Sequence, residues 1–77
     1  GRGAELKARI ESLRTSVDNT DTLPTGFAGD ARVRLADLDQ AVRNAEHASP
    51  EQQRLTHNSI EQELTDLAAE INAKHRA

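Results

Sequence analysis

The chain has 77 residues, with 10 Lys or Arg, 13 Asp or Glu and no Cys, and a formal net charge of -3 at pH 7. This length limits residues 1–77 to one domain, and the lack of cysteine excludes disulfides and thiolate metal sites. The single aromatic residue, Phe27, and the mild acidity exclude the stacking platforms and cationic surfaces of nucleic-acid binders. No apolar run approaches the roughly 20 residues of a membrane span, so we expect no membrane insertion.

The first helix is expected over residues 4–19. Its apolar residues recur every three or four positions, which places them on one face of a helix; they are Leu6, Ile10, Leu13 and Val17. The Asp-, Asn- and Thr-rich segment 18–22 should end this helix, because such side chains hydrogen-bond to nearby backbone groups. Pro24 disfavours a helical conformation at Leu23, so we expect the longest loop here.

The second helix is expected over residues 27–47, and Thr25 and Asp30 are alternative N-cap residues. Its apolar stripe is the longest in the chain and consists of Phe27, Ala31, Leu35, Leu38, Val42 and Ala45.

The third helix is expected over residues 50–74. Ser49 at the N-cap, Pro50 at the first helical position and Gln52 at the third form a capping box with proline in its favoured place. The stripe of this helix consists of Ile60, Leu64, Leu67 and Ile71.

These three stripes can be buried only against one another or against a partner chain. The connection around residues 48–49 is very short, so the second and third helices must be antiparallel neighbours. We therefore predict an all-α fold, an antiparallel up-down-up three-helix bundle that forms a single domain over residues 1–77.

The charged residues are expected to form pairs within each helix. Four acidic residues precede a basic residue by four positions, which is the favourable order for an ion pair on a helix surface. The pairs are Glu5 with Arg9, Asp30 with Arg34, Asp39 with Arg43 and Glu70 with Lys74.

No group of residues points to catalysis. No serine has His and Asp partners at the spacing of a triad, and the carboxylates are expected on solvated helix faces, where nothing prepares them for acid–base work. A phosphate-binding glycine loop is also absent from the sequence. We expect no enzymatic activity, no cofactor, no metal and no small-molecule substrate.

Three residues are candidate partner contacts: Val33, Leu55 and His57. Val33 and Leu55 point away from their stripes, so they either contact a partner or are scattered surface aliphatics. His57 lies one turn before Ile60 on the stripe. It is either a pH-sensitive or metal-binding residue or a partly solvated histidine at one end of the core. The second interpretation is favoured, because a histidine and Glu61 are too few ligands for a transition metal.

Two families resemble this chain. In size, stripe pattern and lack of cysteine, the whole chain resembles the three-helix modules of Gram-positive surface proteins, of the FIVAR and albumin-binding kinds. Phe27 stands where those modules often carry several aromatic residues. This resemblance implies a stalk or binding module at a bacterial cell surface.

The segment Leu35-Ala36-Asp37-Leu38-Asp39 is similar to the end of the second helix of the BAG domain of co-chaperones, and Arg54 matches an arginine of its third helix. That resemblance implies a docking face on the second and third helices. His57 and Asn58 stand where the BAG family has a basic pair, so its chaperone-binding activity does not carry over.

The sequence predicts a non-catalytic protein–protein interaction or spacer module that presents a helical surface to a protein partner or to a second copy of itself. The alternatives are a co-chaperone-like or adaptor-like docking domain that uses the second and third helices, and a cell-surface stalk module. A cysteine-free composition suits a bacterial cell surface and a cytosol equally, so no location is predicted.

Overall fold

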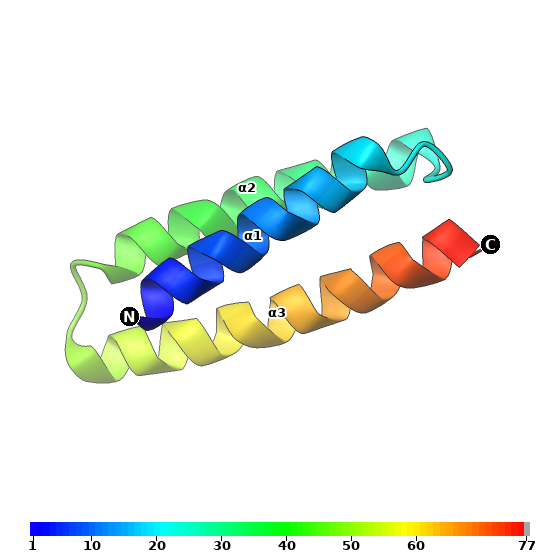
Figure 1. Ribbon diagram of the computed structural model, residues 1–77. Coiled ribbons are helices and arrows are strands. Elements are labelled where there is room, and N and C mark those ends of the chain that lie inside the picture. The colour runs from blue at the N-terminus through cyan, green and yellow to red at the C-terminus, as the bar shows by residue number, and fades with distance from the viewer. Residues whose placement is uncertain (77) are drawn as a thin grey trace.

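A computed structural model describes residues 1–76, which form three helices: α1 (Arg2–Asn19), α2 (Thr25–Ala45) and α3 (Pro50–Arg76). They pack against one another in pairs (Figure 1). The predicted all-α three-helix bundle is therefore confirmed. The bundle is elongated, with dimensions of 41 × 18 × 16 Å.

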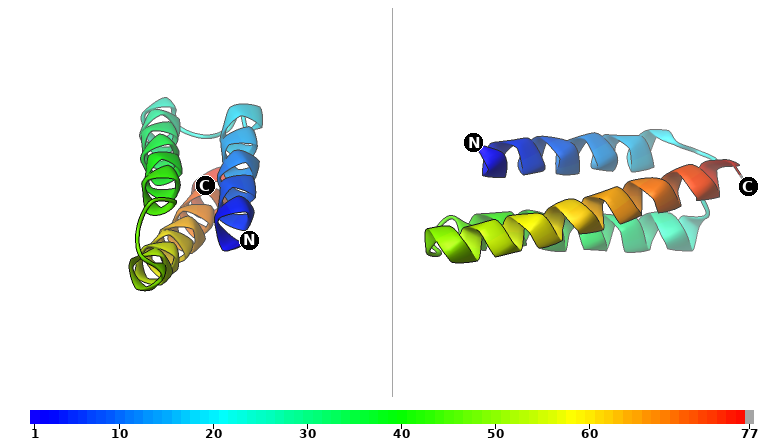
Figure 2. Two further views of the ribbon diagram at one scale, coloured as in Figure 1. Left: turned by 90° about the vertical axis from the view of Figure 1, so that its left-hand side faces the viewer. Right: turned by 90° about the horizontal axis from the view of Figure 1, so that it is seen from below.

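Contacts at the two ends of the bundle show how the helices run. Lys7 Nζ lies 2.7 Å from a carboxylate oxygen of Glu46, so the start of α1 lies beside the end of α2. At the other end, Thr22 Oγ1 lies 2.8 Å from His75 Nδ1, which joins the α1–α2 loop to the end of α3. The helices thus run up, down and up, as the end-on and side views in Figure 2 also show.

The helix ends differ from the expected ones by about two residues. α1 begins at Arg2 and α3 continues to Arg76, while α2 covers Thr25–Ala45. Neither Thr25 nor Asp30 is the N-cap of α2. That position is held by Pro24, whose carbonyl oxygen accepts the N–H of Ala28 at 2.9 Å. Helix ends depend on such local competition between caps more than on the apolar pattern.

Half of the predicted capping box of α3 is present. The Gln52 N–H donates to Ser49 Oγ at 3.2 Å, so Ser49 is the N-cap as predicted. The side chain of Gln52 instead donates to Thr56 at 3.5 Å. The neighbouring Gln53 amide donates to the carbonyl oxygens of Glu46 and Ala48, each at 3.4 Å. Gln53 thus supports the connection between α2 and α3.

The core follows the three predicted stripes. Leu13 and Phe27 are only partly buried, whereas Leu23 and Ala28 join the core from outside the predicted set. No buried polar or charged side chain occurs in residues 1–76, so the core is purely apolar. Its buried members are Leu6, Ile10, Val17, Leu23, Ala28, Ala31, Leu35, Leu38, Val42, Ala45, Ile60, Leu64, Leu67 and Ile71.

The stripe assignment predicts that replacing two leucines of α3 by alanine lowers the free energy of unfolding by different amounts. Leu64 is 0% exposed and Leu55 is 48% exposed. Leu64→Ala should lower the free energy of unfolding by about 2–5 kcal/mol, because it removes transfer energy and leaves a cavity. Leu55→Ala should cost far less. Urea unfolding monitored by circular dichroism measures both, and equal losses would contradict the assignment.

The cap of α3 gives a second prediction. Ser49→Ala should lower the free energy of unfolding by about 0.5–2 kcal/mol, because the Gln52 N–H loses its acceptor. Ser59→Ala, on the exposed surface of the same helix, is the matched control and should be nearly neutral. A neutral Ser49→Ala variant would show that the cap does not stabilise α3.

Candidate functional site

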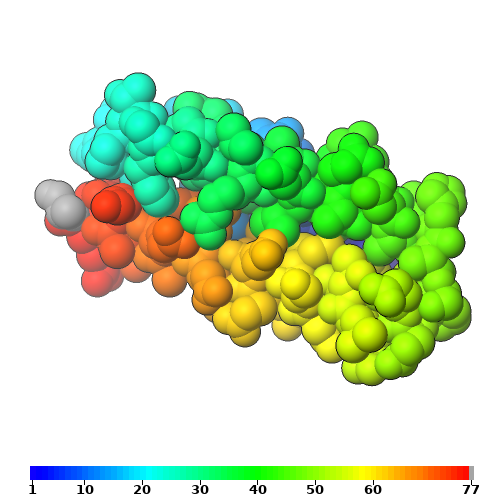
Figure 3. Space-filling view, turned by 180° about the vertical axis from the view of Figure 1, so that it is seen from behind, coloured from blue at the N-terminus to red at the C-terminus, as the bar shows by residue number. Residues whose placement is uncertain are grey.

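A shallow groove runs between α2 and α3, with a cavity volume of about 350 Å³. Figure 3 looks onto the face that these two helices form. We call this cavity the α2–α3 groove. It is lined by Arg34, Asp37, Leu38, Ala41, Glu63 and Asp66.

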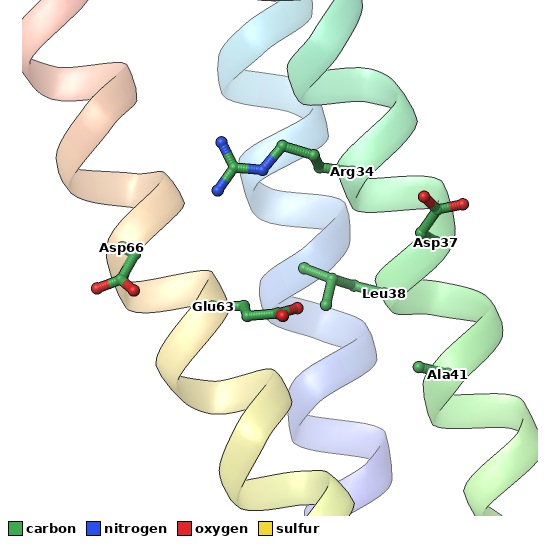
Figure 4. Close-up of a pocket in the computed structure, with 6 residues that line it drawn as sticks. All are labelled: Arg34, Asp37, Leu38, Ala41, Glu63 and Asp66. Carbon is green, nitrogen blue, oxygen red and sulfur yellow. The ribbon is translucent and has the colours of Figure 1, made fainter.

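Helical spacing places these side chains along the groove. The groove residues of α2 lie at positions 34, 37, 38 and 41, and those of α3 at positions 63 and 66. Spacings of three and four residues place each set on one side of its helix. In Figure 4, Arg34 extends from α2 towards α3 and Glu63 extends from α3 towards Leu38. Leu38, only 6% exposed, and the half-buried Ala41 form a small apolar floor.

Arg34 pairs across the groove and not along its own helix. Its Nη2 atom lies 3.0 Å from a carboxylate oxygen of Glu70 on α3. The prediction that Arg34 pairs with Asp30 is therefore wrong. The side chain of Arg34 lies at the seam between two helices, where a longer-range partner is within reach.

Two other predicted pairs fail for the same reason. Arg9 reaches across to Thr65 on α3, at 3.5 Å from its hydroxyl oxygen. Lys74 lies over the ring of Phe27, 5.9 Å from its centre, and not on Glu70. Of the four predicted pairs, only that of Asp39 with Arg43 forms.

The electrostatic environment of Arg34 shows how acidic the groove is. The hydrogen bond to Glu70 raises the pKa of Arg34 above its usual value, partly offset by burial. The negative charges of Glu70, Glu63 and Asp66 raise this pKa further. One guanidinium is thus attracted by three carboxylates of α3.

The groove carries a local charge equal to the formal net charge of the whole chain. With Glu70 included, the groove holds four carboxylates and one guanidinium, a local charge of -3. The chain has 13 acidic and 10 basic residues, so nine of each lie elsewhere and balance. Among residues 1–76, none of Asp37, Glu63 and Asp66 takes part in an ion pair. The groove therefore carries negative charge that the fold leaves uncompensated.

The three residues singled out from the sequence do not come together. Val33 is 61% exposed and Leu55 48% exposed, and neither lines the groove. His57 is half-buried and lines a different cavity of about 510 Å³, beside Gly3 at the start of α1. Within residues 1–76, no group of three or more His, Cys, Asp or Glu side chains is placed to hold a metal ion.

The two cationic side chains at the His57 cavity both have ion-pair partners. Arg2 pairs with Glu61 at 3.1 Å, and Lys7 pairs with Glu46 at 2.7 Å. The hydrogen bond from Lys7 lowers the pKa of Glu46. Because these cations already have partners, this cavity offers less to a charged ligand than the α2–α3 groove does.

The sequence contains a signal for the groove that hydropathy does not reveal. Glu63, Asp66 and Glu70 follow one another by three and four positions, which places them on one face of α3. No Lys or Arg lies within four residues of Glu63 or Asp66. Glu63 and Asp66, without a local cation, therefore predict uncompensated charge.

Comparison with known proteins places the chain in a family. All 77 residues match DUF6474, described as a family of unknown function, and the chain belongs to it. No curated protein and no solved structure is detectably similar. The helices of residues 1–76 are too short or too polar to cross a membrane.

The uncompensated carboxylates give a stability prediction. The free energy of unfolding of the double variant Asp37→Asn, Glu63→Gln should lie within about 0.5 kcal/mol of that of the parent protein, because neither residue has an ion-pair partner in residues 1–76. Glu70→Gln, which removes the partner of Arg34, should cost up to about 1 kcal/mol. Urea unfolding compares the three proteins. A loss above about 1 kcal/mol in the double variant would show that its carboxylates support the fold.

Proposed function

We propose that this member of DUF6474 is a non-catalytic interaction module that binds a protein partner on the face formed by α2 and α3. The observation that carries this proposal is the local charge of -3 at one groove with an apolar floor. Outside the groove, the nine acidic and nine basic residues of the chain are equal in number.

Glu70 supports the fold through its ion pair with Arg34, but no ion pair of residues 1–76 uses the other three carboxylates of the groove. Like charges on neighbouring turns of a helix repel one another by a few tenths of a kcal/mol, and Glu63, Asp66 and Glu70 lie on neighbouring turns of α3. A partner that brings positive charge to the groove would relieve this repulsion. Complementary potentials of this kind also speed the encounter and exclude wrong partners.

The sign of the charge narrows the class of partner. A second copy that docks through the same groove would bring together two surfaces of charge -3, so self-association through this face is disfavoured. Nucleic acids and anionic lipid surfaces are repelled by this face for the same reason. A different protein with a positively charged surface fits best.

A spacer is the second candidate function, and one observation favours it. Residues 1 and 76 lie at opposite ends of a bundle 41 Å long (Figure 1), which suits a rod-like unit in a chain of several domains. A spacer needs no partner on any face. An interaction module, by contrast, has a partner protein against α2 and α3 in the cell.

Site-specific photo-crosslinking in the cells that make the full-length protein tests the proposal. A photoreactive amino acid replaces Asp37 at the rim of the groove, and Glu5, an exposed carboxylate on α1, is replaced in the control. We expect the Asp37 position to give a covalent product with one protein, identified by mass spectrometry, and the Glu5 position to give none.

Three results would contradict the proposal. An absence of product at Asp37 would favour the spacer. The same products from both positions would show contact without a defined face. A product of twice the protein's mass would make the partner a second copy of the chain.

A further inference from the structure

The groove already holds one guanidinium, and this side chain shows which chemistry the groove accepts. Arg34 extends across the groove from α2 (Figure 4) and is bonded to Glu70 at 3.0 Å. Glu63 and Asp66 also attract it, as the raised pKa of Arg34 shows. These two carboxylates have no cation of their own in residues 1–76, so a second guanidinium would meet the same kind of environment.

The spacing of the carboxylates matches a helix. Asp66 and Glu63 lie four and seven residues before Glu70 on α3, which corresponds to about one and two helical turns, or roughly 6 and 10 Å. An incoming helix with cationic side chains one turn apart would place one beside each carboxylate. A groove between two helices also suits a helix, whose anchor residues recur every three or four positions.

The apolar floor of the groove determines which further side chain the partner segment needs. Leu38 and Ala41 are the only apolar residues that line it, and both are largely covered. Such a floor has room for a small apolar contact beside the charged ones. The matching segment is therefore amphipathic and mainly cationic on the face that docks.

Resting on the proposed function, we propose that the partner segment in the α2–α3 groove is a basic amphipathic helix of another protein. Its arginine side chains pair with Glu63 and Asp66, and one aliphatic side chain covers Leu38 and Ala41.

A synthetic helix tests this proposal without knowledge of the natural partner. The probe is an alanine-based peptide of about 16 residues, long enough to be helical in water, with arginine on three successive turns of one face and leucine between them. The control peptide has glutamine in place of arginine. Both are titrated into the isotope-labelled protein at moderate salt, where charges more than about 10 Å apart are screened, and backbone and methyl chemical shifts are followed by NMR.

The expected result is saturable binding of the arginine peptide, with the largest shifts at Leu38, Ala41 and Glu63, and no binding of the glutamine peptide. The double variant Glu63→Gln, Asp66→Asn should bind about tenfold more weakly, the effect of losing two exposed ion pairs. The double variant Glu5→Gln, Asp21→Asn removes the same charge elsewhere on the surface. It should change the affinity less than about twofold at moderate salt.

Three results would overturn the inference: no saturable binding of the arginine peptide, shifts centred outside the groove, or equal weakening by both double variants. The photo-crosslinking experiment separates such a failure from a failure of the proposed function. A crosslinked partner segment that is neutral or acidic would refute the basic helix and leave the interaction module intact.

Discussion

All three helices depend on one shared apolar core. Ile10 in α1, Leu35 in α2 and Leu64 in α3 are each completely buried in the same cluster. Because no polar group is buried in residues 1–76, no directional bond in the core selects the arrangement. The spacing of the stripes and the shortness of the loops select it instead, since burial is favourable but has no direction of its own. The charged residues are consequently left on the surface, where folding constrains them little.

The contrast between a core set by apolar spacing and a surface that folding constrains little explains how much of the fold the sequence predicts. The stripes are a local property of each helix, so periodicity identified nearly all of the core. Leu23 was missed because it lies in the α1–α2 loop, where no periodicity exists, yet it is only 8% exposed. The N-cap of α2 was missed because Pro24 competes with Thr25 and Asp30 over a few residues, and patterns of apolar residues do not resolve such competition.

The candidate site was harder to predict, because it depends on how two helices face each other. Hydropathy selected Val33 and Leu55, which are exposed but do not line the groove. The acidic stripe of α3 is visible in the sequence, whereas the position of Arg34 and Asp37 opposite it requires the alignment of α2 against α3. The pairing of Arg34 with Glu70 shows the same limit. Rules for pairs within a helix fail where a side chain reaches the neighbouring helix.

The energetics of such a groove define the kind of interaction it can support. Exposed ion pairs contribute about 0–1 kcal/mol each, and covering a small apolar floor adds about 1–2 kcal/mol. With two ion pairs the total is at most about 4 kcal/mol, which corresponds to a dissociation constant of about 1 mM. At physiological salt the charges act over only about 8 Å, so the proposed binding would be local, rapid and reversible. Stable attachment then requires several such contacts at once, because linked weak sites gain affinity from their effective concentration. An elongated bundle with its ends 41 Å apart is suited to repeated arrangement, so the interaction and spacer functions are compatible in one protein.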